Sequence, residues 1–245
     1  MVIKNKMPGK KIVKSTKIGD YEELDDIDHV LLRPDMYVGS NRLRTIEEFI
    51  AVKEEDNYKL IQENIKMSPA ILRIFVEALS NAIDNVERSK GTKTPCTKIS
   101  VNINEETGET TVWNDGKVVP IECNDDGRYI HTMIFGHLRT GSNYNDEEER
   151  IVSGRNGFGI KLCNIFSTEF SVEGCDPEKS KILTQKWTNN MRSTTGPKVK
   201  ATKLKKGYTK VSWIPDFSRF SLKGYTKDII QLYTRYVIDA AMLAK

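Results

Sequence analysis

The sequence predicts a layered α+β domain, and three observations carry this prediction. A long amphipathic helix is expected over residues 68–90, because apolar side chains recur there at helical spacing. Several shorter runs alternate between apolar and polar residues, as strands do. The helices and strands follow one another without an internal repeat, and neighbouring strands read as hairpins. A mixture of helices and antiparallel strands is typical of a layered α+β domain.

The first part of the chain is expected to hold a basic arm, a short helix and a hairpin. Residues 1–19 contain six lysines and no acid, and we expect a flexible arm there. A helix beginning near Tyr21 ends before Pro34, because proline disfavours helix in the residue that precedes it. Residues 46–67 alternate loosely and predict two strands that turn near Asp56 and Asn57.

The helix over residues 68–90 is the best-defined element. Ser68 is a suitable N-cap, Pro69 suits the first turn, and Gly91 ends the helix. One face is apolar. The opposite face carries polar side chains, with Asn85 at the border of the two: Glu77, Asn81, Asp84 and Arg88.

The remaining elements complete a sheet and three further helices. The expected strands are residues 97–104, 109–114, 169–175, 181–188 and 208–214. The expected helices are residues 129–138, 157–167 and 225–244. Residues 139–156 are polar and contain glycine, and loops of that length in a compact domain are usually functional or disordered.

Composition excludes several classes of protein. Of the 245 residues 38% are hydrophobic and 29% charged, and no apolar stretch approaches the roughly 20 residues that a membrane span needs. Residues 1–19 have no apolar core of the kind that a secretory signal has. The four cysteines form no C-x-x-C pair and the three histidines are scattered, so reduced thiols and no zinc site are expected.

The net charge of +4 is too small to indicate a nucleic-acid-binding protein by itself. Its distribution is uneven, because residues 196–210 repeat the pattern of the arm, with six lysines and no acid. Such segments neutralise phosphates, or they are simply solvated loops and tails. The sequence leaves both interpretations open.

Glu77 and Asn81 form the first pattern with chemical potential. They lie four residues apart, so they share one helix face one turn from each other. A carboxylate can deprotonate a water, and an amide oxygen can bind Mg²⁺, which prefers oxygen ligands. Solvated polar residues on an outer helix face give the same pattern.

A turn and a glycine-rich segment provide two further patterns. WNDGKV at residues 113–118 follows a strand, and Asn114 or Asp115 can accept a hydrogen bond from an adenine amino group; a plain turn is the alternative. GRNGFGIK at residues 154–161 precedes a helix, whose exposed N–H groups favour phosphate, with Lys161 adding a charge. It is not a Walker A loop. The small polar residues 140–144 can bond a sugar, or form an ordinary loop.

Together and in this order, these four patterns resemble the nucleotide site of the GHKL ATPases. The flanking segments are similar to the ATPase region of eukaryote-type type IIA DNA topoisomerases: LLRPDMYVGS at 31–40, IFGHLRTGSNY at 134–144, GRNGFGIKLCNIFST at 154–168 and WIPDFSRF at 213–220. The resemblance covers roughly residues 20–240. It implies a two-layer α/β sandwich of the GHKL (Bergerat) fold, with a mixed, mostly antiparallel sheet and helices on one face.

The resemblance also implies roles for single residues. Glu77 takes the place of the general base, and Asn81 that of the Mg²⁺ ligand. The implied ATP contacts are Asn81, Asn85, Asn114, Ser142, Asn143, Gly154, Arg155, Asn156, Gly157, Phe158, Gly159, Ile160, Lys161 and, from an N-terminal strap that crosses to the partner subunit, Tyr21. Lys161 is also assigned a catalytic role. Two positions depart from the family pattern: Val118 stands where many relatives have glycine, and Gly141 where a small hydroxyl residue is common.

The functional expectation is an ATP-hydrolysing gate. It binds Mg-ATP, forms a homodimer on binding it, and drives passage of duplex DNA in the intact topoisomerase, with no membrane partner. Residues 1–19 would be the arm, 20–240 the ATPase domain and 241–245 the start of a link to a transducer domain, which in the family supplies a further lysine. The location implied is the nucleus, or host-cell replication sites for a viral protein. The alternatives are a nucleotide-dependent dimerisation module with negligible turnover, and a basic DNA-binding domain.

Overall fold

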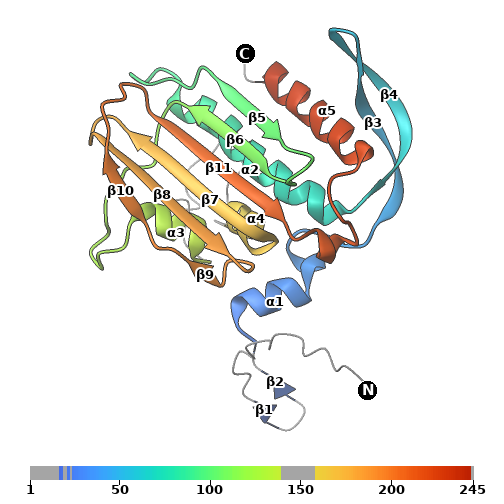
Figure 1. The fold of residues 1–245 in the computed structure, drawn as a ribbon, viewed down its shortest axis with the longest axis horizontal. Helices are drawn as coiled ribbons and strands as arrows, with labels where there is room; N and C mark the ends of the chain where they lie inside the picture. The colour runs from blue at the N-terminus through green and yellow to red at the C-terminus, as the bar shows by residue number, and fades with distance from the viewer. Residues whose placement is uncertain (1–16, 19–20, 23, 139–157, 244–245) are drawn as a thin grey trace, which may run out of the picture.

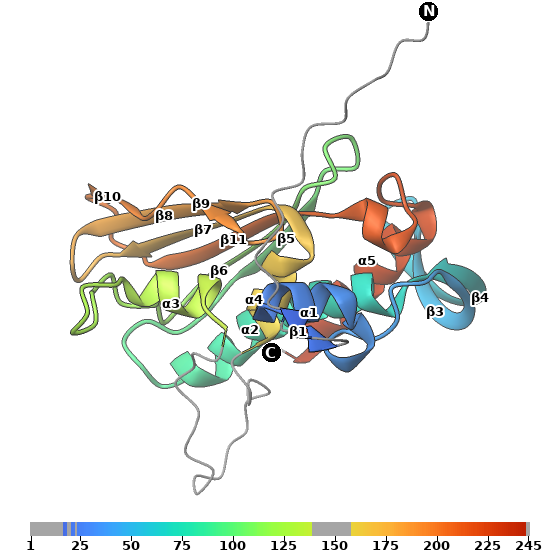
Figure 2. The same ribbon diagram turned by 90° about the horizontal axis from the view of Figure 1, so that it is seen from below.

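The computed structural model describes residues 17–18, 21–22, 24–138 and 158–243. These residues build a seven-stranded sheet with helices on one face, as Figures 1 and 2 show from two sides. All its strand pairs are antiparallel, and the order is β10-β8-β7-β11-β6-β5, with β9 beside β8. The α+β prediction and the placement of the helices are therefore confirmed. The strands are β5 (Ile99–Ile103), β6 (Thr110–Asp115), β7 (Ser167–Asp176), β8 (Lys181–Thr188), β9 (Ser193–Thr194), β10 (Lys198–Ala201) and β11 (Tyr208–Pro215).

Strand β10 was not expected from the sequence. It lies in the lysine-rich segment and pairs with Lys181–Thr184 at one edge of the sheet. Edge strands are often short and rich in lysine, which discourages pairing with other chains. Its four residues, KVKA, are too few for their alternation to stand out within a lysine-rich segment, and that is why the sequence pattern missed it.

Helix α2 (Pro69–Ser89) confirms the predicted long helix. Ser68 occupies the N-cap position, but its hydroxyl makes no capping bond and instead donates to the carbonyl of Ser40 at 3.1 Å. Gly91 follows the helix with a φ of +72°, a conformation that glycine adopts at little cost. Most of the apolar stripe of α2 is buried, with Ile71, Ile74 and Phe75 each 0% exposed, and its last residues, Ile83 and Val86, are partly buried.

Three other helices surround α2 on the same side of the sheet (Figure 2). They are α3 (Ile130–Gly136), α4 (Gly159–Ile165) and α5 (Lys227–Leu243), each within a few residues of its predicted range. Helix α5 packs on α2 through the stacked rings of Phe75 and Tyr233, whose centroids are 3.8 Å apart. The Tyr233 hydroxyl also donates to the carbonyl of Ile71 at 2.6 Å. Helix α2 is therefore held by the sheet on one side and by α5 on another.

The predicted hairpin over residues 46–67 is confirmed and stands apart from the main sheet. Strands β3 (Arg44–Glu54) and β4 (Asn57–Met67) pair along their full length and turn at Glu55 and Asp56. Figure 1 shows the hairpin beside α5. Arg235 of α5 contacts Glu48 of β3 at 3.5 Å.

The first helix begins later than expected. Helix α1 (Asp26–Leu32) starts at Asp26, because the side chain of Asp25 accepts a hydrogen bond from the N–H of Asp28 at 2.8 Å and caps the helix there. Tyr21 lies instead in β2 (Tyr21–Glu22), which pairs with β1 (Lys17–Ile18). Lys17 and Ile18 of the expected arm thus pair with Glu22 and Tyr21. Pro34 opens the short 3-10 helix η1 (Pro34–Met36), as a proline at a first turn can. A second 3-10 helix, η2 (Phe217–Phe220), precedes α5.

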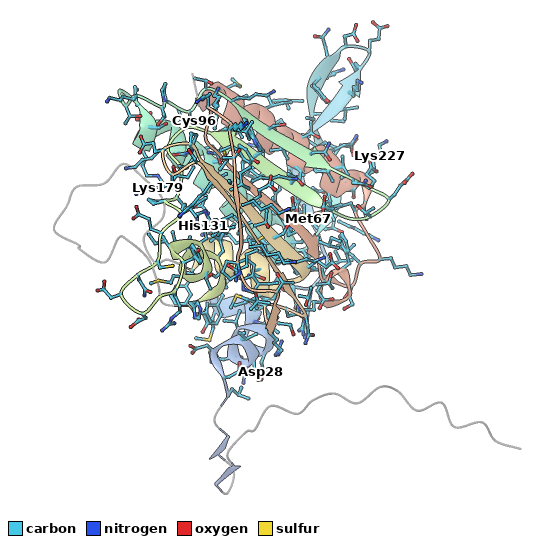
Figure 3. The ribbon with its side chains drawn as sticks, turned by 60° about the vertical axis from the view of Figure 1, so that its left-hand side comes forward. Asp28, Met67, Cys96, His131, Lys179 and Lys227 are labelled. Atoms are coloured by element: carbon cyan, nitrogen blue, oxygen red, sulfur yellow. The ribbon has the colours of Figure 1, made fainter. Side chains whose placement is uncertain are left out.

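One polar side chain is buried in the core without a partner. His131 of α3, labelled in Figure 3, is 0% exposed, and neither ring nitrogen has a hydrogen-bond partner among the described residues. Burial lowers its pKa to about 4, although the charge of Asp176 opposes the shift. The ring is therefore neutral at pH 7.

Within the described ranges no helix is long and apolar enough to cross a membrane, and no cluster of acidic, histidine or cysteine side chains has the make-up of a metal site.

Candidate active site

Three polar side chains form a line along α2. Glu77, Asn81 and Asn85 follow one another at four-residue spacing, so they lie one turn apart on the same helix face. At 1.5 Å per residue the line spans about 12 Å. Glu77 and Asn81 are partly exposed, whereas Asn85 is buried beside the sheet. The line therefore connects an open end near α4 with a closed end at β6.

Glu77 marks the open end, where α2 meets the start of α4. A Cβ added to Gly159, the first residue of α4, would lie 1.9 Å from Oε2 of Glu77. The carboxylate thus occupies the space that a side chain at residue 159 would take. Arg73, one turn earlier, holds the other carboxylate oxygen at 2.5 Å. A carboxylate is in this way fixed beside the end of the glycine-rich segment.

Lys161 is almost completely buried in α4, at 1% exposed. Burial lowers its pKa to about 8, because a charged ammonium is poorly solvated there. The amine is thus still mainly protonated at pH 7, and a nearby anion would favour the charged form. Ile160 is also buried, at 8% exposed, and its side chain belongs to the core. Ile160 can therefore offer a ligand chiefly its backbone N–H.

The closed end of the line is built by two amides. The side-chain nitrogens of Asn85 and Asn114 both donate to the backbone carbonyl of Asp115, at 3.1 and 2.8 Å. This fixes β6 against α2. Asn114 uses its side-chain nitrogen in this bond, and its side-chain oxygen accepts no hydrogen bond from the described residues. It is the acceptor available at this end of the site.

The carboxylate of Asp115 is already fully engaged. Burial opposes its ionisation, but hydrogen bonds from Lys206, Thr97 and Lys98 prevail and hold the pKa of Asp115 well below its ordinary value. The distances are 2.5 Å to Lys206 Nζ, 2.7 Å to each Thr97 donor and 2.8 Å to Lys98 N. Successive strand residues point to opposite faces. Of the two acceptors that the sequence left open, only Asn114 therefore faces the line on α2.

Gly116 is required at the turn that follows. Its φ is +103°, and an added Cβ would lie 2.7 to 2.9 Å from three atoms of Cys96, two of them backbone. The backbone of residue 96 cannot retreat easily, since the N–H of Cys96 donates to Ser89 at 2.7 Å. The turn can thus approach its neighbours closely only as glycine.

Two residues of the site were missed by the sequence reasoning. Arg73 lies at the same four-residue spacing before Glu77, and this spacing is the signal that would have identified it. Thr209 of β11 pairs with Asn114, so its hydroxyl shares the face that carries the amide. Only the register of two strands that are distant in the sequence brings Thr209 to this position.

Several expected contacts lie outside the described residues. They are Ser142, Asn143, Gly154, Arg155, Asn156 and Gly157. For Tyr21 the structure describes the backbone alone.

A carboxylate, a line of amides and a glycine at a helix start, all set against one face of an antiparallel sheet, form a candidate nucleotide site in an α+β domain. The profile described as "Histidine kinase-, DNA gyrase B-, and HSP90-like ATPase" matches residues 67–210, which is more than half of the sequence. The chain belongs to this family.

Comparisons with individual proteins show which members of this family the chain resembles. The chain is 45% identical over 234 residues to DNA topoisomerase 2 of Invertebrate iridescent virus 6, which covers 91% of this chain and 20% of the relative. The structure is similar to the ATPase region of Saccharomyces cerevisiae topoisomerase II, with a TM-score of 0.84, 41% identity, and coverage of 90% of this chain and 57% of that one. The 43K ATPase domain of Thermus thermophilus gyrase B shares the fold alone, with a TM-score of 0.61 and 19% identity. The GHKL resemblance is confirmed.

Proposed function

We propose that the chain binds ATP along α2 and hydrolyses it with Glu77 as the general base. The observation that carries this proposal is the contact of the Glu77 carboxylate with Gly159 at the start of α4. Glu77 would remove a proton from a water whose oxygen attacks the γ-phosphorus. The bond between that phosphorus and the β–γ bridging oxygen breaks, and ADP and phosphate leave. Positioning of this kind supplies most of the catalysis in phosphoryl transfer.

The adenine would lie at the closed end of the line. We infer that its exocyclic amine donates to the free oxygen of Asn114, while Thr209 offers a hydroxyl beside it. Asn85 keeps this acceptor in place by binding the same carbonyl of Asp115 as Asn114 does. In this proposal Asn85 is a positioning residue.

The triphosphate would lie at the open end, near the start of α4. Gly159 and Ile160 would offer backbone N–H groups, and Lys161 a charge. Phe158, which precedes α4, would border the same end. For Ser142, Asn143 and residues 154–157 the proposal rests on the family resemblance alone: the first two would hold the ribose and the others the phosphates. Tyr21 would contact the partner subunit's nucleotide.

Mg²⁺ fits the donor set on α2. The amide of Asn81 makes no hydrogen bond with the described residues and lies between the base and the closed end. Mg²⁺ commonly binds one or two protein oxygens together with substrate phosphates, so one amide oxygen suffices. When bound, it would neutralise phosphate charge, and Asn81 would be the residue that holds it.

The chain spans about a fifth of the viral relative and 57% of the yeast ATPase region, so the activity of a whole topoisomerase is proposed here only by analogy. Two copies would dimerise around bound ATP and act as a gate for duplex DNA. By the same analogy the protein would act in a nucleus, or where a virus replicates its DNA.

Sedimentation with Mg²⁺ and a non-hydrolysable ATP analogue tests the binding and dimer steps. The wild type should shift to a dimer, and Lys161→Ala should lose the shift. Absence of nucleotide binding in the folded wild type would refute the ATP site. Binding without dimerisation would refute only the gate.

A second candidate is a binding module that turns ATP over negligibly, and the Arg73–Glu77 ion pair favours it, because the Arg73 guanidinium occupies one of the two carboxylate oxygens. Glu77→Gln separates the two candidates. General-base catalysis contributes about 10²–10⁴-fold, so the variant should bind ATP normally and lose that much turnover. An unchanged hydrolysis rate would support the binding module.

A further inference from the structure

The sheet face turned away from the helices is uncovered in the part of the chain that the structure describes (Figure 2). Register places the polar side chains of this face in rows across the strands. One row holds Lys198, Thr184, Glu173, Lys210 and Trp113, from β10 across to β6. The open face is thus polar and nearly flat.

A shallow cavity of about 250 Å³ lies on this face. Its charged and hydroxyl-bearing lining residues are three lysines, four hydroxyl groups and one carboxylate: Lys186, Lys198, Lys210, Ser171, Thr184, Thr195, Ser212 and Glu173. Lysine, serine and threonine are side chains that proteins use to contact phosphate oxygens. The chemistry of the face therefore suits a phosphate-bearing ligand.

The charge of the face is strongly positive toward β10. Within the described residues five exposed lysines have no acidic group within 4.0 Å, and they are Lys198, Lys200, Lys203, Lys205 and Lys210. The three acids of this face are all engaged, and Asp115 pairs with Lys206 at 2.5 Å. Glu169 pairs with Lys186 at 2.6 Å, and Glu173 accepts from the Tyr208 hydroxyl at 2.9 Å.

We propose that this open face binds duplex DNA through its phosphate backbone and without nucleotide. Lys198 and Lys210 lie three strands apart in one row, about 14 Å at the usual strand spacing, so they can contact well-separated phosphates. Single-stranded binding requires free aromatic surfaces on which bases stack. Trp113 and Tyr208 instead pack against each other, with ring centroids 5.9 Å apart, and neither is fully exposed. The face therefore favours a duplex.

This inference goes beyond the proposed ATP site and stands separately from it. The lysines lie on the other side of the sheet from Glu77 and Asn114. Loss of DNA binding and loss of nucleotide binding can therefore be told apart in one set of variants.

The test is fluorescence anisotropy of the nucleotide-free chain with a labelled blunt 20-base-pair DNA across a series of salt concentrations. The face variant is Lys198→Gln, Lys200→Gln and Lys210→Gln together. The matched control removes three exposed lysines from the hairpin and the loop before α5: Lys53→Gln, Lys66→Gln and Lys223→Gln. Each lost phosphate contact should weaken binding about eightfold at 0.1 M salt and make the salt slope shallower by about 0.9.

The expected result is a large loss in the face variant, little change in the control, and recovery when the same three lysines become arginine. Nucleotide affinity should stay at the wild-type value in all of them. Equal loss in both triple variants, no loss in the face variant, or no duplex binding by the wild type would overturn the proposal. Tighter binding of a single strand of equal length would overturn the choice of duplex.

Discussion

Replacement of Gly159 by alanine should slow ATP turnover strongly while leaving the fold intact. The new Cβ would lie 1.9 Å from Oε2 and 2.8 Å from Cδ of Glu77, whereas Cβ contacts under 3.0 Å essentially never occur. The carboxylate must then retreat by at least about 1 Å. Because it is the end of a flexible side chain, it can move without the backbone.

The expected change in stability is small, whereas the expected change in hydrolysis rate is large. Stability should change by no more than about 1 kcal/mol, since alanine also favours helix over glycine by a similar amount. A misplacement of 1 Å in catalytic geometry can cost about 100-fold in rate. The variant should therefore bind ATP nearly normally and hydrolyse it about 100-fold more slowly.

The assay combines steady-state ATP hydrolysis, nucleotide titration and thermal unfolding. Gly224→Ala is the matched control, because nothing lies within 4 Å of an added Cβ there and its φ is not positive. The hydrolysis rate of the Glu77→Gln variant serves as the reference for turnover without the general base. A folded Gly159→Ala variant with the wild-type kcat would refute the idea that the carboxylate acts from its position beside α4.

Three further predictions concern buried groups. Since the pKa of His131 is about 4 when folded against 6.5 when free, the unfolded state gains the proton first, and stability should fall by about 3 kcal/mol as the pH drops from 6.5 to 4. Denaturant unfolding of His131→Leu should show a shallower fall over this window; an equal slope would contradict the assignment. Nucleotide affinity should weaken as the pH rises through 8, where Lys161 of the nucleotide-free protein loses its proton, and Lys161→Arg should remove that dependence in calorimetric titrations. Gly116→Ala should destabilise the fold by about 2 kcal/mol or more, because residue 116 combines a φ of +103° with contact to backbone, and an unchanged melting temperature would show that the turn is not constrained.

Local patterns predicted most of the fold. The apolar stripe of α2, the alternation in β7 and β8, and the turns of the hairpins are all features of neighbouring residues. Elements without such a pattern were missed or misplaced. Strand β10 is short and lysine-rich, and α1 begins where Asp25 caps it rather than near Tyr21.

The sequence by itself determined that Glu77 and Asn81 share one helix face, with Asn85 at its border, because helical spacing is a local property. It also placed glycines where backbone must approach closely. Only the tertiary structure decided that Gly159 meets Glu77, that Thr209 pairs with Asn114, and that Asp115 is engaged on the other side of β6. These contacts join residues that are far apart in the chain, and they depend on strand register and helix packing, which no local pattern encodes.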